Sequence, residues 1–258
     1  MTVSEFYRIL DTLYPRSLSC SWDNDGMMVC PDPETEVRRV LLSLDATEKA
    51  VAYAAENGCQ LLLTHHPLLF RPLRALNGES LTGRRILASI GAHLTVVSLH
   101  TRLDSGDKGV NDMLAEALGL SVSGKFGDAE APELGRLSVL AEPADAAAFA
   151  DHVRVALGCD AVRLTGEHPV RCVALVGGDG KDMLHPAMLA GADTLVTGAA
   201  SYNSALDAAE EGMNVIEAGH YHTEAPVLLR LAELCRTYTG AECLFFDSCR
   251  TRLLTARQ

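Results

Sequence analysis

The chain has 258 residues, 48% of them hydrophobic and 22% charged, enough to bury the core of one large or two modest domains. A formal charge of −12 leaves no basic surface for a phosphate backbone and argues against nucleic acid as a partner. Residues 1–17 predict a short amphipathic helix that ends at Pro15, unlike a signal peptide, and no apolar run reaches the roughly 18 residues that a membrane span needs. We therefore expect a cytoplasmic protein that makes no membrane contact.

Apolar runs alternate with helical patterns through the first half of the chain. The pattern predicts strands at 37–44, 60–64 and 93–99 and helices at 47–57, 83–90 and 110–118. Because the strands are almost entirely apolar, the sheet that they form should be buried on both faces. Asp45, with Glu48 three residues later, has the spacing of a capping box at the start of the first of these helices.

The second half of the chain repeats this plan at a separation of 133 residues. The segment VRRVLLSLD (37–45) aligns with VRCVALVGG (170–178), and NGCQLLLTHH (57–66) aligns with AGADTLVTGA (190–199), both without a gap. The third strand, in IGAHLTVVSLH (90–100), has a looser counterpart in EGMNVIEAGH (211–220), and each of these ends in a histidine. Chance similarity between apolar runs is the alternative, but the shared order of elements favours a duplicated βα unit.

The repeat predicts an α/β fold of two similar, duplicated α/β domains with a cleft between them. The segment 119–135, rich in glycine and serine, is the expected join. We therefore expect a first α/β domain at 1–125 and a second α/β domain at 126–225. The closing strand at 242–246 has no counterpart in the repeat, and we expect the C-terminal segment 226–258 to return to the first domain and complete it.

Two adjacent histidines, His65 and His66, end the second predicted strand just before Pro67. Neighbouring residues of a regular strand point to opposite faces, so such a pair inside a buried strand would place one imidazole in an apolar layer. The pair should therefore lie beyond the carboxyl end of the strand, where open α/β sheets collect their ligands.

Two further clusters follow the third strand of each half. SLHTRLD (98–104) carries His100 and Asp104, while EAGHYHTE (217–224) carries His220, His222 and Glu224. His220 and Glu224 are four residues apart, so on a helix they share one face and can reach one ion. Each cluster alone is weak evidence, because a single histidine at a strand end is more often a surface or capping residue.

Taken together, His65, His66, Asp104, His220 and Glu224 exceed the needs of one tetrahedral metal ion and indicate two ions bridged by a carboxylate. A set of imidazoles and carboxylates without cysteine suits Zn, Fe, Mn or Ni and does not select among them. We expect His100 to be a catalytic proton carrier beside the ions, and His222 stays open between that role and an orienting one. The remaining histidines are expected to have no role in the site: His93, His152, His168 and His185.

Four segments resemble the signature segments of the dinuclear metal centre hexameric proteins, a family catalogued as GTP cyclohydrolase I type 2 homologues or NGG-interacting-factor-three-like proteins. They are SWDNDGMMV (21–29), LLLTHHPLLFRPLRAL (61–76), SLHTRLDSGDKGVNDMLAEALGL (98–120) and NVIEAGHYHTE (214–224), in the order of the family. The similarity covers most of the chain. It implies two similar α/β domains, a two-metal site in the cleft between them, and a toroidal homohexamer.

The resemblance assigns the ligand positions of the family to the same five residues, His65, His66, Asp104, His220 and Glu224. It also implies a metal-dependent hydrolase with a small-molecule substrate such as a nucleotide, since the catalogued activity is opening of the GTP imidazole ring with release of formate. The sequence has no glycine-rich phosphate loop, and the candidates for holding phosphate groups are Arg71, Arg74 and Arg102. The alternative from another class is a non-catalytic metal-binding hexameric scaffold or regulatory protein.

The chain departs from the family pattern at three places. Asp25, Met27 and Met28 stand where relatives have a small or aliphatic residue followed by Gly-Leu. The segment 134–138 has Leu-Ser in place of an expected glycine, and the segment 196–203 lacks the acidic and histidine residues that many relatives carry. None of these positions is a ligand, so the departures bear on substrate contacts rather than on the metal site.

Overall fold

The computed structural model describes residues 1–249, which fall into two compact units. The first unit comprises Met1–Gly106 and Leu228–Ser248, and the second comprises Asp107–Val227. Each unit has its own sheet and its own buried core, so each is described by itself. Within residues 1–249, no helix is both long and apolar enough to cross a membrane.

Five strands form the sheet of the first unit: β1 (Gly26–Val29), β2 (Arg39–Ser43), β3 (Leu61–Thr64), β4 (Thr95–Ser98) and β11 (Glu242–Phe245). Their order is β1-β4-β3-β2-β11, with β1 antiparallel at one edge and the other four parallel. Every residue of β3 and β4 is buried, as expected for strands that are covered on both faces.

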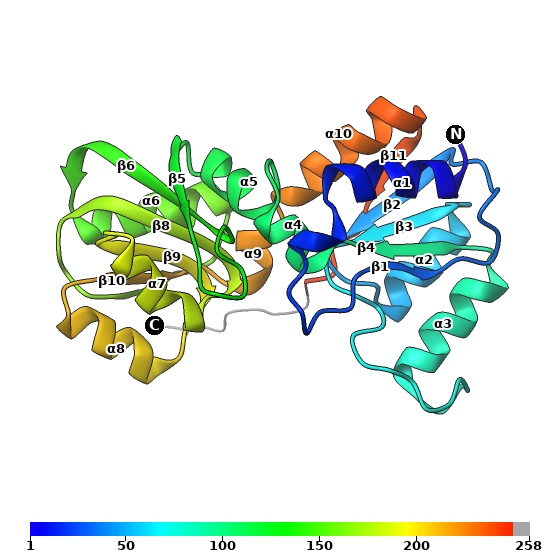
Figure 1. Cartoon of the computed structure of the whole chain (residues 1–258), viewed down its shortest axis with the longest axis horizontal. Coiled ribbons are helices and arrows are strands. Elements are labelled where there is room, and N and C mark those ends of the chain that lie inside the picture. The colour runs from blue at the N-terminus through cyan, green and yellow to red at the C-terminus, as the bar shows by residue number, and fades with distance from the viewer. Residues whose placement is uncertain (250–258) are drawn as a thin grey trace, which may run out of the picture. The chain divides into compact units, whose positions relative to one another are not determined.

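Helices cover both faces of this sheet: α1 (Val3–Leu13), η1 (Arg16–Leu18), α2 (Glu48–Glu56), α3 (Leu81–Gly91), α4 (His100–Ser105) and α10 (Val227–Thr239). Figure 1 shows α1 and α10 on one side of the sheet and α3 on the other. α1 begins with a capping box, in which the Thr2 side chain accepts from the Glu5 N–H and the Glu5 carboxylate accepts from the Thr2 N–H. On the opposite side, α2 and α3 pack their apolar faces onto β2, β3 and β4 in one buried cluster.

Six strands form the sheet of the second unit: β5 (Val122–Phe126), β6 (Gly135–Ala144), β7 (Arg163–Thr165), β8 (Val170–Asp179), β9 (Thr194–Ala199) and β10 (Asn214–Glu217). Their order is β5-β6-β8-β9-β10-β7, and β8, β9 and β10 are parallel. The helices of this unit are α5 (Val110–Ala117), α6 (Ala146–Leu157), η2 (Lys181–Met183), α7 (Leu184–Leu189), α8 (Tyr202–Glu210) and α9 (His220–Glu224).

The two units repeat one plan, which confirms the prediction of two similar α/β domains. In the first unit β2 pairs with β3 through Val40 and Leu61, and in the second β8 pairs with β9 through Val173 and Thr194. Both partners of the second pair lie 133 residues after those of the first, so the repeat extends to the strand register. In each unit an antiparallel strand also lies beside the third parallel strand, β1 beside β4 and β7 beside β10.

The boundary between the units lies at Gly106, ahead of the expected join at 119–135. The cause is α5, because Leu114 and Leu118 are buried in one cluster with Val173 and Leu175 of β8, not with the first sheet. At the other end of the chain, β11 pairs with β2 of the first unit, the position that the sequence analysis expected for the closing strand. Residues 250–258 of the expected C-terminal segment lie outside the described residues.

Candidate functional site

Three histidines of the first unit meet at the carboxyl ends of β3 and β4. His65 and His66 directly follow β3, and His100 opens α4 two residues after β4. One ring nitrogen of each histidine lies within 4.8 Å of one ring nitrogen of the others. The Asp104 Oδ1 atom adds a carboxylate at 3.5 Å from His65 Nε2. This first cluster therefore gathers four of the residues that the sequence nominated, His100 included.

The backbone after β3 explains how two adjacent histidines fit at a strand end. The His66 N–H donates to the Leu44 carbonyl at 2.9 Å, and the Thr64 hydroxyl lies 2.9 Å from the His66 carbonyl. These bonds hold the chain as it leaves the sheet. His65 is fully buried there, while His66 is partly exposed. The pair thus lies outside the ladder of β3, as expected from its adjacency.

Two of these imidazole rings are each held by an aspartate through the Nδ1 atom of the ring. The His66 Nδ1–H donates to Asp45 at 2.9 Å, and the His100 Nδ1–H donates to Asp23 at 2.8 Å. A carboxylate can only accept, so the proton is on Nδ1 in both rings and Nε2 is the atom left for a metal or for a transferred proton. Carboxylates commonly orient metal-binding histidines in this way.

Neither aspartate was predicted from the sequence as a partner of a site histidine. The capping box expected at Asp45 is wrong, because the N-cap of α2 is Thr47, whose side chain accepts from the Ala50 N–H at 3.0 Å. Asp45 instead accepts from His66 and from the Ser248 hydroxyl. The sequence did contain one indication of this role. Asp45 follows a buried parallel strand directly, at the same sheet edge as His65 and His66.

The hydrogen-bonded side chains of Asp23 and His100 both have shifted pKa values. Burial alone would raise the pKa of Asp23, but hydrogen bonds from His100 and Thr101 outweigh it and lower that pKa to about 2. Burial alone would lower the pKa of His100, but the hydrogen bond to Asp23 and the charges of Asp104 and Asp23 raise it above the ordinary value. The geometry therefore favours a protonated His100 beside an ionised Asp23.

Asp23→Asn should lower the pKa of His100 in the metal-free protein, because burial is then opposed by less negative charge. The raised pKa stabilises the fold at pH below the unfolded pKa of histidine, and this contribution disappears as pH rises through the folded pKa. The lowered pKa of Asp23 stabilises the fold above its unfolded pKa, and that part disappears as pH falls toward about 2. NMR titration of the His100 ring protons measures the shift. An unchanged His100 pKa in the variant would contradict this account.

A second cluster lies in the second unit, on the short helix α9 that follows β10. His220 Nε2 lies 3.0 Å from Glu224 Oε1, so the predicted four-residue spacing does bring the two side chains together. Glu224 is buried, whereas His220 is exposed. The His222 ring makes an edge-to-face contact with Tyr221, with ring centroids 5.7 Å apart. This contact does not decide between the two roles considered for His222.

Glycines of β8 and β9 make room for this second cluster. Gly178 has a left-handed backbone, with φ of 70°, and a side chain there would collide with Glu224 Oε1 and approach His220 Nε2 to 3.3 Å. A side chain at Gly198 would lie 2.7 Å from the His220 Cα atom. The Gly178 N–H also donates to the Thr223 hydroxyl at 3.1 Å. Both glycines lie in the aligned segments of the repeat, but the sequence pattern did not predict this role for them.

One of the three proposed phosphate-binding arginines is not available for that role. Arg102 is fully buried, and its guanidinium donates to Asp25 and Asp11, each at 2.7 Å. Arg71 and Arg74 are exposed. Asp25 is one of the departures from the family pattern, so this departure serves the interior of the first unit rather than a substrate.

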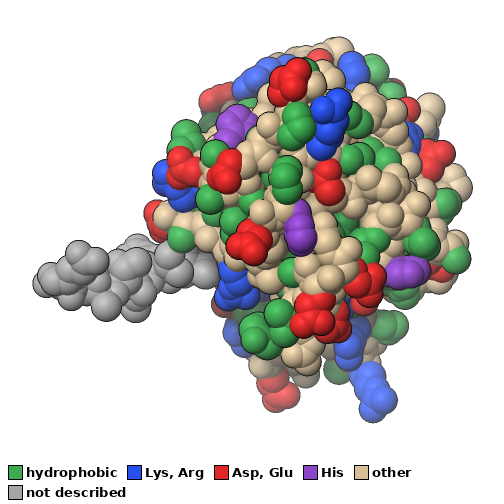
Figure 2. Space-filling model, turned by 90° about the vertical axis from the view of Figure 1, so that its left-hand side faces the viewer, with side chains coloured by type: hydrophobic (Ala, Val, Ile, Leu, Met, Phe, Trp, Pro, Cys, Tyr) green, Lys and Arg blue, Asp and Glu red, His purple; other side chains and the backbone are tan. Residues whose placement is uncertain are grey.

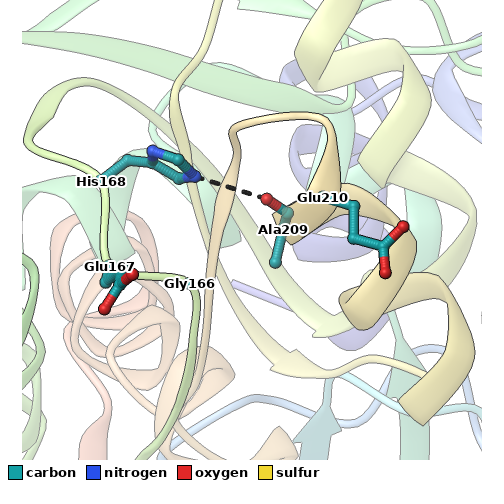
Figure 3. A pocket seen from close by; sticks show the side chains of 5 residues that line it. All are labelled: Gly166, Glu167, His168, Ala209 and Glu210. Carbon is teal, nitrogen blue, oxygen red and sulfur yellow. Dashed lines mark hydrogen bonds between the residues drawn. The ribbon is translucent and has the colours of Figure 1, made fainter.

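A pocket on the second unit does not coincide with either cluster. It is lined by Gly166, Glu167, His168, Ala209 and Glu210. Figure 3 shows the His168 ring turned toward the Ala209 carbonyl, 3.4 Å from it, with the two glutamates pointing elsewhere. On the face of this unit that Figure 2 presents, acidic and hydrophobic side chains are interspersed and Lys and Arg side chains stay scattered.

Comparisons with known proteins place these features in context. The sequence model of Duf34/NIF3 (NGG1p interacting factor 3) matches residues 1–250. The "GTP cyclohydrolase 1 type 2 homolog" of Clostridium perfringens is 34% identical over 254 residues, 96% of each chain. The "GTP cyclohydrolase 1 type 2" of Helicobacter pylori is 30% identical over 239 residues, 92% of each chain. Among solved structures, Staphylococcus aureus protein SA1388 has a TM-score of 0.87 at 25% identity, covering 98% of this chain and 99% of its own.

Proposed function

The chain belongs to the Duf34/NIF3 family, and from that premise we propose that it is a hydrolase that uses two divalent transition-metal ions on a nucleotide substrate. The observation that carries the proposal is the set of oriented donors in the two clusters. The names of the Clostridium perfringens and Helicobacter pylori relatives support a nucleotide with a hydrolysable ring.

The donors fit such ions. His65, His66 and Asp104 of the first unit and His220 and Glu224 of the second would hold them, and imidazole with carboxylate suits Zn, Fe, Mn or Ni. The Asp45 carboxylate fixes the ring of His66 with Nε2 available, and Gly178 leaves space for Glu224. When bound, such ions act as Lewis acids and make water nucleophilic near neutral pH.

His100 is proposed as the proton carrier of the reaction. Hydrolytic opening of an imidazole ring breaks a carbon–nitrogen bond, and the leaving nitrogen needs a proton. Asp23 holds His100 by Nδ1 and raises its pKa, which leaves Nε2 as the atom that can carry that proton. The same contact keeps the ring from turning, which keeps Nε2 in one position.

Elemental analysis of the purified protein tests the metal content. We expect about two transition-metal ions per chain, reduced at least to half in His66→Ala and in Glu224→Ala, because two-metal sites share their ligands. His168→Ala, a histidine outside both clusters, is the matched control and should keep the wild-type content. Trace metal that is unchanged in both ligand variants would refute the proposal. Loss of metal in only one variant would show that the residue changed in the other variant is not a ligand.

His100→Ala separates a proton carrier from a metal ligand. A proton carrier should leave the metal content unchanged and lower the turnover of GTP by about 10²-fold to 10⁴-fold. Loss of metal in this variant would assign His100 to the ligands instead. Full metal content without turnover of GTP or other nucleotides, in the wild-type protein, would favour the alternative of a non-catalytic metal-binding homohexamer.

A further inference from the structure

Two exposed aromatic rings border the first cluster. Trp22 is 57% exposed and Phe70 is 43% exposed, although both are large apolar side chains. Their ring centroids lie 6.1 Å apart, and each lies near the His100 ring, at 6.1 Å for Trp22 and 6.2 Å for Phe70. All three contacts are edge-to-face, so these rings form no parallel stack with one another.

The loops that carry the two rings are held in place by polar contacts. Asp23, next to Trp22, accepts from the Thr101 N–H at 3.1 Å and from the His100 ring. The Asn24 side chain donates to the carbonyl of Leu69, the residue before Phe70. The positions of the rings are therefore fixed by their chain neighbours, and the rings themselves stay open to solvent. Such fixed, exposed aromatic rings are suited to stacking on a planar ligand.

Positive charge follows Phe70 in the chain. Arg71 and Arg74 are exposed, and neither forms an ion pair within residues 1–249. In a chain with a net charge of −12, two exposed arginines without acidic partners are suited to an anionic ligand.

We propose that Trp22 and Phe70 form a platform for the heterocyclic base of a purine nucleotide, in which the base stacks on Trp22 and contacts Phe70 edge-on, with Arg71 and Arg74 supplying charge for its phosphate groups. The proposal rests on the proposed function and names recognition residues for it. The contact of both rings with His100 makes the platform continuous with the first cluster, so a base bound there lies beside the proposed proton carrier.

Trp22 is the single tryptophan of the chain, so its fluorescence reports on the platform directly. The probes are GTP, guanosine and inorganic tripolyphosphate, titrated into the purified protein, with free tryptophan correcting for absorption by the nucleotide. We expect saturable quenching by GTP and, more weakly, by guanosine, because both carry the base. Tripolyphosphate should bind without quenching. Absence of saturable quenching by both GTP and guanosine would overturn the proposal.

Calorimetry extends the test to variants that lack the fluorophore. Trp22→Ala should weaken GTP binding about 10-fold or more, since stacking of one base on an aromatic ring contributes on that scale. Trp22→Phe should retain most of the affinity, and neither variant should change the affinity for tripolyphosphate. Tyr202→Ala, which removes an aromatic ring 75% exposed in the second unit, is the matched control.

Metal analysis of the same samples separates this inference from the proposed function. Quenching by GTP in a protein without metal would support the platform and refute the hydrolase. Wild-type metal content with unchanged GTP affinity in Trp22→Ala would refute the platform and leave the hydrolase. Shielding of Trp22 from acrylamide in the free protein, with Trp22→Ala reducing the size of the oligomer, would show a subunit contact and refute the platform.

Discussion

Replacing Arg102 with leucine is expected to destabilise the first unit by about 3 to 5 kcal/mol, the typical cost of removing one partner of a buried ion pair. Arg102 and the Asp25 carboxylate are both fully buried, 2.7 Å apart. Without the guanidinium, Asp25 keeps the Ser19 hydroxyl at 2.7 Å and the exposed Arg16 at 3.4 Å. These contacts replace only part of the interaction, so most of the desolvation cost remains. Urea unfolding, followed by Trp22 fluorescence and circular dichroism, measures the change.

The exposed pair of Arg38 and Glu36 supplies the control for this prediction. Arg38→Leu breaks an ion pair of 2.6 Å whose side chains are 76% and 56% exposed, so it should cost far less stability than Arg102→Leu. A double variant, Arg102→Leu with Asp25→Leu, should recover part of the lost stability, because no buried charge then lacks its partner. Equal stability of Arg102→Leu and Arg38→Leu would show that the buried pair contributes little.

Gly178→Ala is expected to destabilise the second unit by about 3 kcal/mol and to displace Glu224. A left-handed backbone costs a residue with a side chain about 1 to 2 kcal/mol, and overpacking adds about 1 to 3 kcal/mol. The new methyl group would collide with Glu224 Oε1, so the glutamate must move away from His220. Hydrogen exchange of the β8 and β9 amides measures the stability, and elemental analysis of the same variant measures the metal content.

Gly191→Ala separates the two causes. Gly191 has φ of 84°, in the left-handed region like Gly178, but a side chain there meets no atom within 4 Å. This control should lose only the backbone contribution, about 1 to 2 kcal/mol, and keep its metal. If Gly178→Ala matches Gly191→Ala in both stability and metal content, the close contact with Glu224 has no consequence for the second cluster.

Local patterns in the sequence were sufficient for the parallel strands β2, β3 and β4, for the helices α2, α3 and α5, and for the repeat. They did not predict the antiparallel strands, which are β1, β5, β6 and β7. The strand expected at 60–64 is β3, Leu61–Thr64, because an unbroken apolar run between polar segments marks a buried strand. The helix expected at 110–118 is α5, Val110–Ala117, but its sheet was not predictable from its own residues. The pattern of apolar residues in α5 is compatible with packing against the sheet of either unit. Only the observed contact with β8 shows that it belongs to the second unit.

The partners of the site histidines could not be predicted in the same way. Asp23 lies 77 residues from His100, and nothing in the loop around it indicates a buried carboxylate. For Arg102 the prediction of a phosphate-binding role was wrong. It was made because a charged residue next to ligand motifs suggests a substrate contact. Arg102 proved to be the counterion of Asp25 instead. In both cases the deciding contact joins segments that are remote in the chain, which periodicity and spacing do not report.

The shared plan of the two units has a consequence for how the clusters came to differ. Each unit opens the helix after its third parallel strand with a histidine and places a carboxylate four residues later, His100 with Asp104 and His220 with Glu224. In a dimer of two identical units, symmetry would make the two sets of side chains identical. Two units within one chain have separate sequences and are free of that constraint. The first unit can therefore carry additional imidazoles and carboxylates, and the second unit the glycines beside Glu224. A substitution in one unit is not repeated in the other.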